Sequence, residues 1–386
     1  MTKMCTTALL LVLAATGCGS DDNAGDPSGA GAGGNGGSVD VGGMGGGGGT
    51  PCPVGSHAVG DTCEAALGPF TETSSIASAR DHHVTWAAER AGGTFLYVAG
   101  GAEDMTSAVT SIERTRIADD GSLGPWEILP GGLTAVGHMV VSTDARVFFA
   151  GGQRAGGVSA NSEGATIADD GSLGPLEPGP AMNVPRFHGA AVLHDGWIYA
   201  TGGIDADGTS SALVERLAFS ESGPQGAWIL EEQAMPEQRS HHGLAVSDEG
   251  RLYVTGGLTR IMNDFGNDTP YDTVLASDLQ PDGSIGEWSV VGTLPFPLAV
   301  HASFVHAGQL YVATGLDMST EQFVGSIMRA TLNEDGTLGS WETLSSALPI
   351  TRGHCHQTPL VNGWLYSVAG TNNLGSQTNA FAAQFE

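Results

Sequence analysis

The chain has 386 residues, of which 60 are glycine and 15% are charged, and its formal net charge is −28 at pH 7. Lys3 is the only lysine, so the remaining positive charge is arginine. Such an acidic surface repels phosphate backbones, which argues against a nucleic-acid partner. A phosphate-binding P-loop is also excluded beyond residue 3, because that motif needs its lysine.

The first 18 residues are organised like an export signal. Lys3 precedes the apolar run TALLLVLAAT, and the sequence ATGC ends at Cys18. The run is too short to stay in a membrane as a spanning helix. The segment resembles a bacterial lipoprotein signal peptide, which implies that Cys18 carries lipid. We therefore expect an exported protein anchored to the bacterial cell envelope, at the outer membrane and facing the periplasm or the surface. Secretion without an anchor is the alternative.

Three further regions follow in chain order. Residues 19–50 are a tract of glycine and small polar residues that cannot bury a core, so we expect a flexible tether there. Residues 51–66 form a short cysteine-bounded loop. Residues 67–386 carry a repeated pattern and are expected to form one folded domain.

Two cysteines delimit the short loop. Cys52 and Cys63 stand close together in a chain that we expect to be exported, which predicts a disulfide bond between them. Zinc binding that also uses His57 is the alternative, but it would have only three ligands and would lie in an oxidising compartment. Cys355, between His354 and His356, is expected to be a small buried hydrophobe rather than a metal ligand.

The repeated pattern is clearest in HGAAVLHDGWIYATGG, residues 188–203. It predicts two short strands joined by a tight Asp195-Gly196 turn, with a glycine pair ending the second strand. The second strand recurs as FLYVAGG, VFFAGG, WIYATGG, RLYVTGG, QLYVATG and WLYSVAG. We take as its register mark one glycine in each unit, namely Gly100, Gly151, Gly202, Gly256, Gly315 and Gly370. Six such units at a nearly constant period indicate repeated supersecondary structure.

A second hairpin follows each of the first five glycines. It is written DDGSLGPW, DDGSLGPL, ESGPQGAW, PDGSIGEW and EDGTLGSW, and its aromatic residue is expected to pack between neighbouring sheets. Each unit is thus a four-stranded antiparallel sheet with strands a to d, and six such sheets predict an all-β, six-bladed propeller. The sixth unit lacks strand d. Residues 67–80 match the missing pattern, with Phe70 in the tryptophan position, so we expect this N-terminal strand to complete the last blade.

These units resemble Kelch repeats, in which an arginine and a histidine precede a YVxGG strand and a later tryptophan. The resemblance covers residues 67–386 and implies a Kelch-like propeller, similar also to the central domain of galactose oxidase. It says little about activity, because propellers of this kind include binders, scaffolds and a few enzymes.

Polar residues recur where strand a begins, at one mouth of the central channel. We assign one histidine to each unit and note a preceding arginine in four units, and we take these ten residues as candidate ligand-binding positions: Arg80, His83, His138, Arg186, His188, Arg239, His242, His301, Arg352 and His356. The arginines suit a carboxylate or sulfate, and the histidines suit a transition metal. We favour a third interpretation, in which these side chains bond the blades together, and we expect no metal or other cofactor.

Two connections after strand b add candidates for recognition. The loop at residues 258–272 is the longest and contains Arg260, Met262, Phe265 and Tyr271. The acidic turn DADGTS, residues 205–210, would suit calcium, although such turns are commonly just solvated. With no catalytic signature in the chain, we expect a tethered, non-catalytic module that binds a glycan, a peptide or a protein. The alternative is an enzyme similar to sialic-acid mutarotases, which would use the arginines at the channel mouth.

Overall fold

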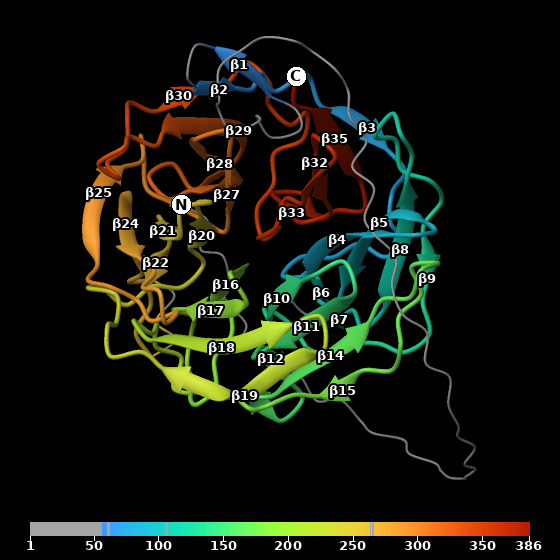
Figure 1. Ribbon diagram of the computed structural model, residues 1–386, viewed down its shortest axis with the longest axis horizontal. Coiled ribbons are helices and arrows are strands. Elements are labelled where there is room, and N and C mark those ends of the chain that lie inside the picture. The colour runs from blue at the N-terminus through green and yellow to red at the C-terminus, as the bar shows by residue number, and fades with distance from the viewer. Residues whose placement is uncertain (1–55, 60–61, 105–106, 134, 263, 265) are drawn as a thin grey trace. The chain divides into compact units, whose positions relative to one another are not determined.

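The computed structural model describes residues 56–386, apart from 60–61, 105–106, 134, 263 and 265. All regular structure in this part is β, and six sheets stand around a common axis (Figure 1). We call the sheets blades I to VI in chain order, with strand a next to the axis and strand d at the outside. The expected six-bladed, Kelch-like β-propeller is confirmed.

The first three blades are regular four-stranded antiparallel sheets. Blade I contains β4 (Val84–Arg90), β5 (Gly93–Ala99), β8 (Ile112–Ile117) and β9 (Glu127–Ile128). Blade II contains β10 (Met139–Ser142), β11 (Arg146–Ala150), β14 (Ser162–Thr166) and β15 (Glu177–Pro178). Blade III contains β16 (Ala190–His194), β17 (Trp197–Thr201), β18 (Val214–Ser220) and β19 (Gly223–Leu230). The predicted turn in blade III has φ values of 45° at Asp195 and 77° at Gly196, as a two-residue hairpin requires.

Blades IV and V continue this pattern. Blade IV contains β20 (Gly243–Val246), β21 (Arg251–Thr255), β24 (Thr273–Asp278) and β25 (Ser289–Thr293). In blade V strand a is split into β26 (Leu298–Ala299) and β27 (Ala302–His306), and both pieces pair with β28 (Gln309–Asp317). Its outer strands are β29 (Gln322–Thr331) and β30 (Glu342–Thr343).

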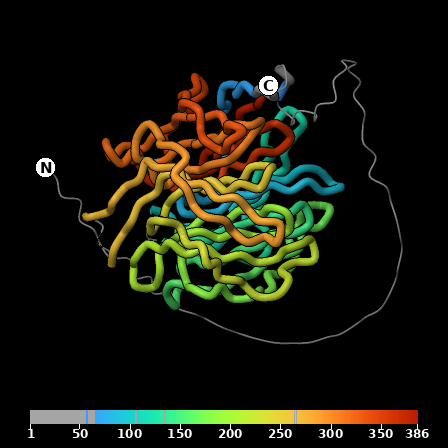
Figure 2. The backbone as a smooth tube through the Cα atoms, turned by 60° about the vertical axis from the view of Figure 1, so that its left-hand side comes forward, coloured from blue at the N-terminus to red at the C-terminus, as the bar shows by residue number. Residues whose placement is uncertain are grey.

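Blade VI is assembled from both ends of the described chain. It contains β31 (Leu360–Val361), β32 (Trp364–Val368) and β35 (Ala380–Gln384), and its outermost strand is β3 (Thr71–Thr73). The pairing of β3 with β35 is antiparallel, with Thr71 opposite Ala382 and Thr73 opposite Ala380. Figure 2 shows this early segment, in blue, beside the C-terminus. The prediction that an N-terminal strand completes the last blade is therefore confirmed.

Small hairpins occupy the connections between strands b and c in four blades. They are β6 (Ala102–Glu103) with β7 (Ser107–Ala108), β12 (Gln153–Arg154) with β13 (Gly157–Val158), β22 (Leu258–Thr259) with β23 (Thr269–Pro270), and β33 (Thr371–Asn372) with β34 (Gly375–Ser376). Bridges such as Asp81 with Ala102 and Gly353 with Thr371 join these hairpins to the segments that lead into strands a. The b–c loops and the d–a connections therefore share one face of the ring, which we call the loop face.

The segment before β3 contains a further hairpin, β1 (His57–Val59) with β2 (Thr62–Glu64). Cys63 lies in β2, but Cys52 lies outside the described residues, so the disulfide stays a prediction. Residues 1–50, with the expected signal and tether, also lie outside the described part. None of the described residues forms a helix that is long and apolar enough to cross a membrane.

Aromatic side chains join neighbouring blades, as the repeat predicted. The indole Nε1 of Trp126 donates to Ser74 O at 2.8 Å, that of Trp228 to Pro180 O at 3.0 Å, and that of Trp288 to Gln233 O at 3.3 Å. In each case the acceptor precedes the blade that contains the tryptophan. Where Leu176 takes this position, its partly buried side chain packs on the cluster between blades I and II without an equivalent polar link.

Strand-b tyrosines add a second set of links. The hydroxyl groups of Tyr97, Tyr199 and Tyr366 donate to the carbonyl oxygens of Gly171, Gly283 and Gly121, at 2.8 to 2.9 Å, in the c–d turn of the next blade. Burial raises the pKa of Tyr199 to about 12, so its proton is retained for this bond at neutral pH.

The glycine that ends strand b permits close packing of the next blade. Gly202 has a φ of 56°, and a Cβ atom there would lie 2.3 Å from the carbonyl oxygen of Arg239. The following amide, Gly203 N, donates to that same oxygen at 2.8 Å. In blades V and VI the first position is Thr314, with φ 60°, and Ala369, with φ 55°. The register marks Gly315 and Gly370 therefore occupy the second position of the pair, one residue later than the sequence analysis assumed.

Candidate functional site

A closed ring of hydrogen bonds surrounds the propeller axis at the loop face. In each blade the residue two places after the arginine position donates its amide to the carbonyl of the equivalent residue in the preceding blade. The six distances lie between 2.7 and 3.1 Å, and the residues are His82, Gly137, His188, His241, Val300 and His354. All six have φ between 52° and 62°. This conformation turns the chain sharply where the d–a connection enters strand a.

Four imidazole groups from this ring fill the axis. The ring centroids of His82 and His354 are 3.8 Å apart, those of His82 and His188 are 4.6 Å apart, and those of His188 and His241 are 4.3 Å apart. All four side chains are buried. The ring centroid of His356, two residues beyond His354, lies 6.4 Å from that of His188. His356 lines the channel just behind the four axial rings. We call His82, His188, His241 and His354 the axial histidines.

A second set of histidines, one residue later in the repeat, links adjacent blades. His83 Nε2 lies 3.0 Å from Val368 O in blade VI. His242 Nε2 lies 2.8 Å from the hydroxyl of Thr201, and His301 Nε2 lies 2.8 Å from the hydroxyl of Thr255. Each partner sits at the end of strand b in the preceding blade, so these imidazoles connect blades, as we favoured from the sequence.

Two further residues occupy the same place in the repeat, in blades VI and II. In blade VI the equivalent residue is Cys355, which is a buried free thiol 3.5 Å from the Thr314 hydroxyl. In blade II it is His138, whose ring lies against Gly100 of blade I. The six histidines taken from the sequence therefore fall into three registers: four join blades, His188 is axial, and His356 is a channel residue.

Burial lowers the pKa of five of these histidines, which keeps His138, His188, His241, His301 and His354 neutral at pH 7. Desolvation is the main cause that lowers the pKa of His138 and His301 to about 3. The same cause, assisted by neighbouring histidines, holds the pKa of His188, His241 and His354 well below the usual value. An uncharged imidazole offers one free lone pair, which is the form that accepts hydrogen bonds or binds metals.

The four arginines of the repeat are fully buried and bind their own blades. Arg80 binds Gly100 O, Ser111 O and the carboxylate of Glu113, and Arg186 reaches Ala200 O, Leu213 O and Glu215, each at 3.2 Å. Arg239 and Arg352 bind equivalent carbonyl oxygens in blades IV and VI. These guanidinium groups hold strands b and c together, and their fully buried donors are not presented to the channel.

The open part of the channel lies behind the axial histidines. A cavity of about 470 Å³ is lined by strand-a residues of all six blades, from His242 and His356 at its closed end to Glu89 and Asp144 near the a–b turns. Its walls combine aliphatic side chains such as Val192 and Leu244 with polar ones such as Thr85 and Gln357. The channel therefore opens on the face opposite the loops, while the polar mouth expected from the sequence is closed by histidine side chains.

The loop face carries exposed apolar side chains around this closed centre. Ile261 and Met262 in the long loop are 58% and 76% exposed, and Leu374 in the β33–β34 turn is 92% exposed. Within the same loop Arg260 forms a two-pronged ion pair with Asp268, at 2.9 and 2.6 Å. Phe265 lies outside the described residues. Tyr271 packs under the loop, with its ring 4.3 Å from the guanidinium carbon of Arg239.

Hydrogen bonds join adjacent blades at three junctions of this face, namely III–IV, V–VI and VI–I. Ser210 N donates to Arg260 O at 2.8 Å, Asn373 Nδ2 donates to Gln322 Oε1 at 3.3 Å, and Asp104 N donates to Ser376 Oγ at 2.7 Å. In the acidic turn, Asp205 Oδ1 accepts from Asp207 N and Thr209 N. That carboxylate oxygen stabilises its own turn. This role corresponds to the alternative to calcium binding that the sequence analysis gave for the acidic turn.

The sheet order, the inter-blade links and the repeated arginines define a Kelch-like propeller, and comparison with known proteins agrees with this. Human Kelch-like protein 33 is 35% identical over 152 residues, which cover 39% of this chain and 25% of that protein. Kelch repeat and BTB domain-containing protein 1 is 27% identical over 190 residues in camelpox virus (strain CMS) and 28% identical over 189 residues in ectromelia virus (strain Moscow). Each viral match covers 49% of this chain.

The matched regions are partial. They span between 25% and 29% of the length of these three relatives. No protein-family model matches the chain. The matches and the six blades together support a Kelch-repeat propeller, a class that typically serves protein interaction.

Proposed function

We propose that the propeller is a non-catalytic binding module that recognises a protein or peptide through its loop face. The observation that carries this proposal is the set of exposed apolar side chains, Ile261, Met262 and Leu374, on two loops that each hydrogen-bond to a neighbouring blade. A rigid ring that presents exposed apolar groups on such loops is suited to recognition. The similarity to Kelch-repeat proteins supports the same class of function.

The apolar character of these loops favours a protein or a peptide over a glycan. The sugar-acid enzyme considered from the sequence required arginines at an open channel mouth. Because all four guanidinium groups are buried and bind carbonyl oxygens of their own blades, they offer no anion clamp. We therefore do not extend the proposal to sugar chemistry.

The test begins with the immobilised propeller and an extract of cell-envelope proteins and glycans. A bound component is identified, purified, and titrated against the wild type and the triple variant Ile261→Ser/Met262→Ser/Leu374→Ser. We expect the triple variant to weaken binding by more than about tenfold, since each lost apolar contact removes ~1 kcal/mol or more. The matched control is Ile128→Ser/Val290→Ser, which removes exposed apolar groups from the outer strands of blades I and IV.

Two outcomes would contradict the proposal. One is equal binding by the wild type and the loop-face variant, and the other is loss of binding in the outer-strand control alone. Treating the extract with protease or with glycosidase before capture separates the partners, and loss of the ligand only after glycosidase would assign a glycan instead.

We further propose that the exported chain is held at the bacterial envelope by lipid on Cys18, with residues 19–50 as the tether. Support comes from the apolar run before Cys18 and from the glycine-rich composition that follows. Expression with a radiolabelled fatty acid should label the wild type and leave Cys18→Ser unlabelled, whereas Cys5→Ser should label normally. Equal labelling of Cys18→Ser and the wild type would reject the anchor.

A further inference from the structure

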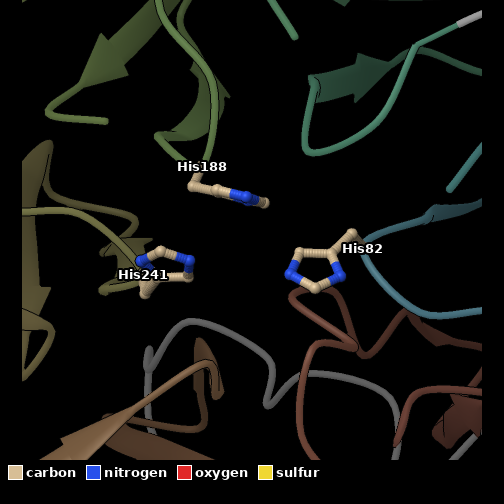
Figure 3. A group of neighbouring side chains, drawn as sticks. All are labelled: His82, His188 and His241. Carbon is tan, nitrogen blue, oxygen red and sulfur yellow. The ribbon is translucent and has the colours of Figure 1, made fainter. Parts of the chain in front are cut away.

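Three axial histidines meet at the centre of the loop face with their nitrogen atoms close together. One ring nitrogen from each of His82, His188 and His241 lies within 4.8 Å of the other two. The three side chains come from blades I, III and IV and project into the same space (Figure 3). All three are buried. From this geometry we infer that His82, His188 and His241 together bind one late first-row divalent metal ion, such as Zn²⁺, on the propeller axis.

Hydrogen bonds orient two of these imidazoles for the role. The Nδ1–H of His82 donates to the carboxylate of Asp81, which leaves Nε2 as the free lone pair. Asp81 is itself fixed, because the hydroxyl of Ser376 donates to its other oxygen at 2.6 Å. A carboxylate behind a histidine is the usual outer partner of a metal-bound imidazole, since it sets the tautomer and raises the basicity of the ligating nitrogen.

His241 is held in a similar way. Its Nδ1 lies 3.1 Å from Ser240 Oγ, and this hydroxyl lies 3.4 Å from Leu258 O, to which it donates. The same hydroxyl accepts from Ser210 Oγ at 3.0 Å. In the tautomer in which His241 Nδ1–H donates to this hydroxyl, Nε2 again keeps a free lone pair. His188 lacks such a restraint: its buried Nδ1 has no hydrogen-bond partner among the described residues. A buried polar atom without a partner is costly, and a bound ion would relieve that cost.

The electrostatic surroundings tolerate a cation. Arg260 is the nearby positive group whose charge acts on His188 and His241. Its guanidinium is neutralised by the two-pronged pair with Asp268, at 2.9 and 2.6 Å. Asp81 adds a negative charge directly behind His82.

Metal binding requires the three histidine nitrogen atoms to move only a short distance toward one another. Nitrogen atoms in a tetrahedral zinc site lie roughly 3.4 Å apart, because each Zn–N bond is ~2.0–2.1 Å long. The widest pair would therefore move together by about 1 to 1.5 Å, which side-chain rotation can supply. Three neutral imidazoles with a fourth position for water or another ligand match late divalent metals, whose affinity for nitrogen sites rises toward copper and zinc.

The experiment uses the full chain without a histidine tag, stripped with a chelator and then titrated with Zn²⁺ and, separately, with Co²⁺. We expect one ion per chain, visible absorption bands of nitrogen-bound Co²⁺, and a higher thermal midpoint with metal, since an ion that binds only the folded state stabilises it. His188→Gln should weaken binding by more than about 100-fold, because even outer hydrogen-bond partners contribute roughly 10–100-fold. Asp81→Asn should weaken metal binding by roughly 10–100-fold, the range for an outer hydrogen-bond partner.

The matched control is His194→Ala, which removes a histidine from the a–b turn end of the same blade as His188 and should bind metal like the wild type. X-ray absorption at the zinc edge of the wild-type protein needs no variant, and it should report three imidazole ligands. A spectrum dominated by oxygen ligands would overturn the proposal, and so would unchanged affinity in His188→Gln. Because the site lies on the axis and not on the exposed loops, its failure would leave the loop-face proposal standing.

Discussion

The buried arginines occupy equivalent places in the repeat but bind partners of different charge. Arg186 faces Glu215, and both side chains are 0% exposed. Arg352, in the same position of blade VI, binds the neutral oxygens Ala369 O, Asn379 O and Asn379 Oδ1 at 2.7 to 3.2 Å. Removal of the first arginine leaves the buried charge of Glu215 without its ion-pair partner, whereas removal of the second leaves neutral acceptors without this donor.

We therefore predict that Arg186→Met destabilises the protein more than Arg352→Met. The first change should lower the free energy of unfolding by ~3–5 kcal/mol, the range for breaking a buried ion pair from one side. The second should lower it by ~1–3 kcal/mol, the range for unpaired buried polar groups. Urea denaturation of both variants measures the difference.

The double variant Arg186→Met/Glu215→Gln serves as the control. Glutamine keeps an oxygen for the donors of Asn183, which now bind Glu215 at 2.7 and 2.8 Å, and it carries no charge. The double variant should therefore recover at least about 1 kcal/mol relative to Arg186→Met. Equal stability of the two single variants, with no recovery in the double, would show that the charge on Glu215 is not what matters.

At the scale of the element, the strand pattern could be predicted from sequence and the exact register could not. Alternating apolar residues, Asp-Gly turns and the recurring tryptophan each depend on local chemistry, and they placed the blades correctly. The axial ring depends instead on positive φ at one residue per blade and on bonds between blades. The φ of Val300 is 55°, and a β-branched residue has no local preference that would predict this conformation from the sequence.

The histidine registers illustrate the same limit. The sequence analysis, which took the glycine as its register mark, grouped His188 with blade-joining residues such as His83 and left out His82 and His241. Alignment on the arginine would have separated them, because Arg-x-His occurs four times and its histidine is axial each time. What no alignment supplies is the distance between side chains from different blades, which depends on the radius of the closed ring.

At the scale of the whole molecule, stability depends on closure of the ring. Each blade is linked to its neighbours by the axial amide bonds. Tyrosine hydroxyls and tryptophan Nε1 groups add links at some of the junctions, and the junction of blades VI and I is completed by the chain before β4. There Trp126 binds Ser74 O, and Phe70 packs in the cluster shared by blades V and VI. A ring with one open junction exposes two sheet faces and an unpaired strand edge.

Deletion of residues 64–76 is therefore predicted to affect the entire propeller and not blade VI alone. It removes β3, the backbone bonds Gly68 N to Gln384 O at 2.8 Å and Ile76 N to Thr378 O at 2.9 Å, and the acceptor of Trp126. We expect loss of the cooperative thermal transition, or a fall of its midpoint by more than about 10 °C, because several kcal/mol of contacts disappear at once. Deletion of residues 1–50, which keeps Cys52 and Cys63, is the control and should leave the midpoint unchanged. A synthetic peptide of residues 64–78 added to the shortened chain should restore the transition, since pairing with β35 needs no covalent link. A shortened chain that melts like the control, with or without peptide, would mean that the other five junctions hold the ring without this strand.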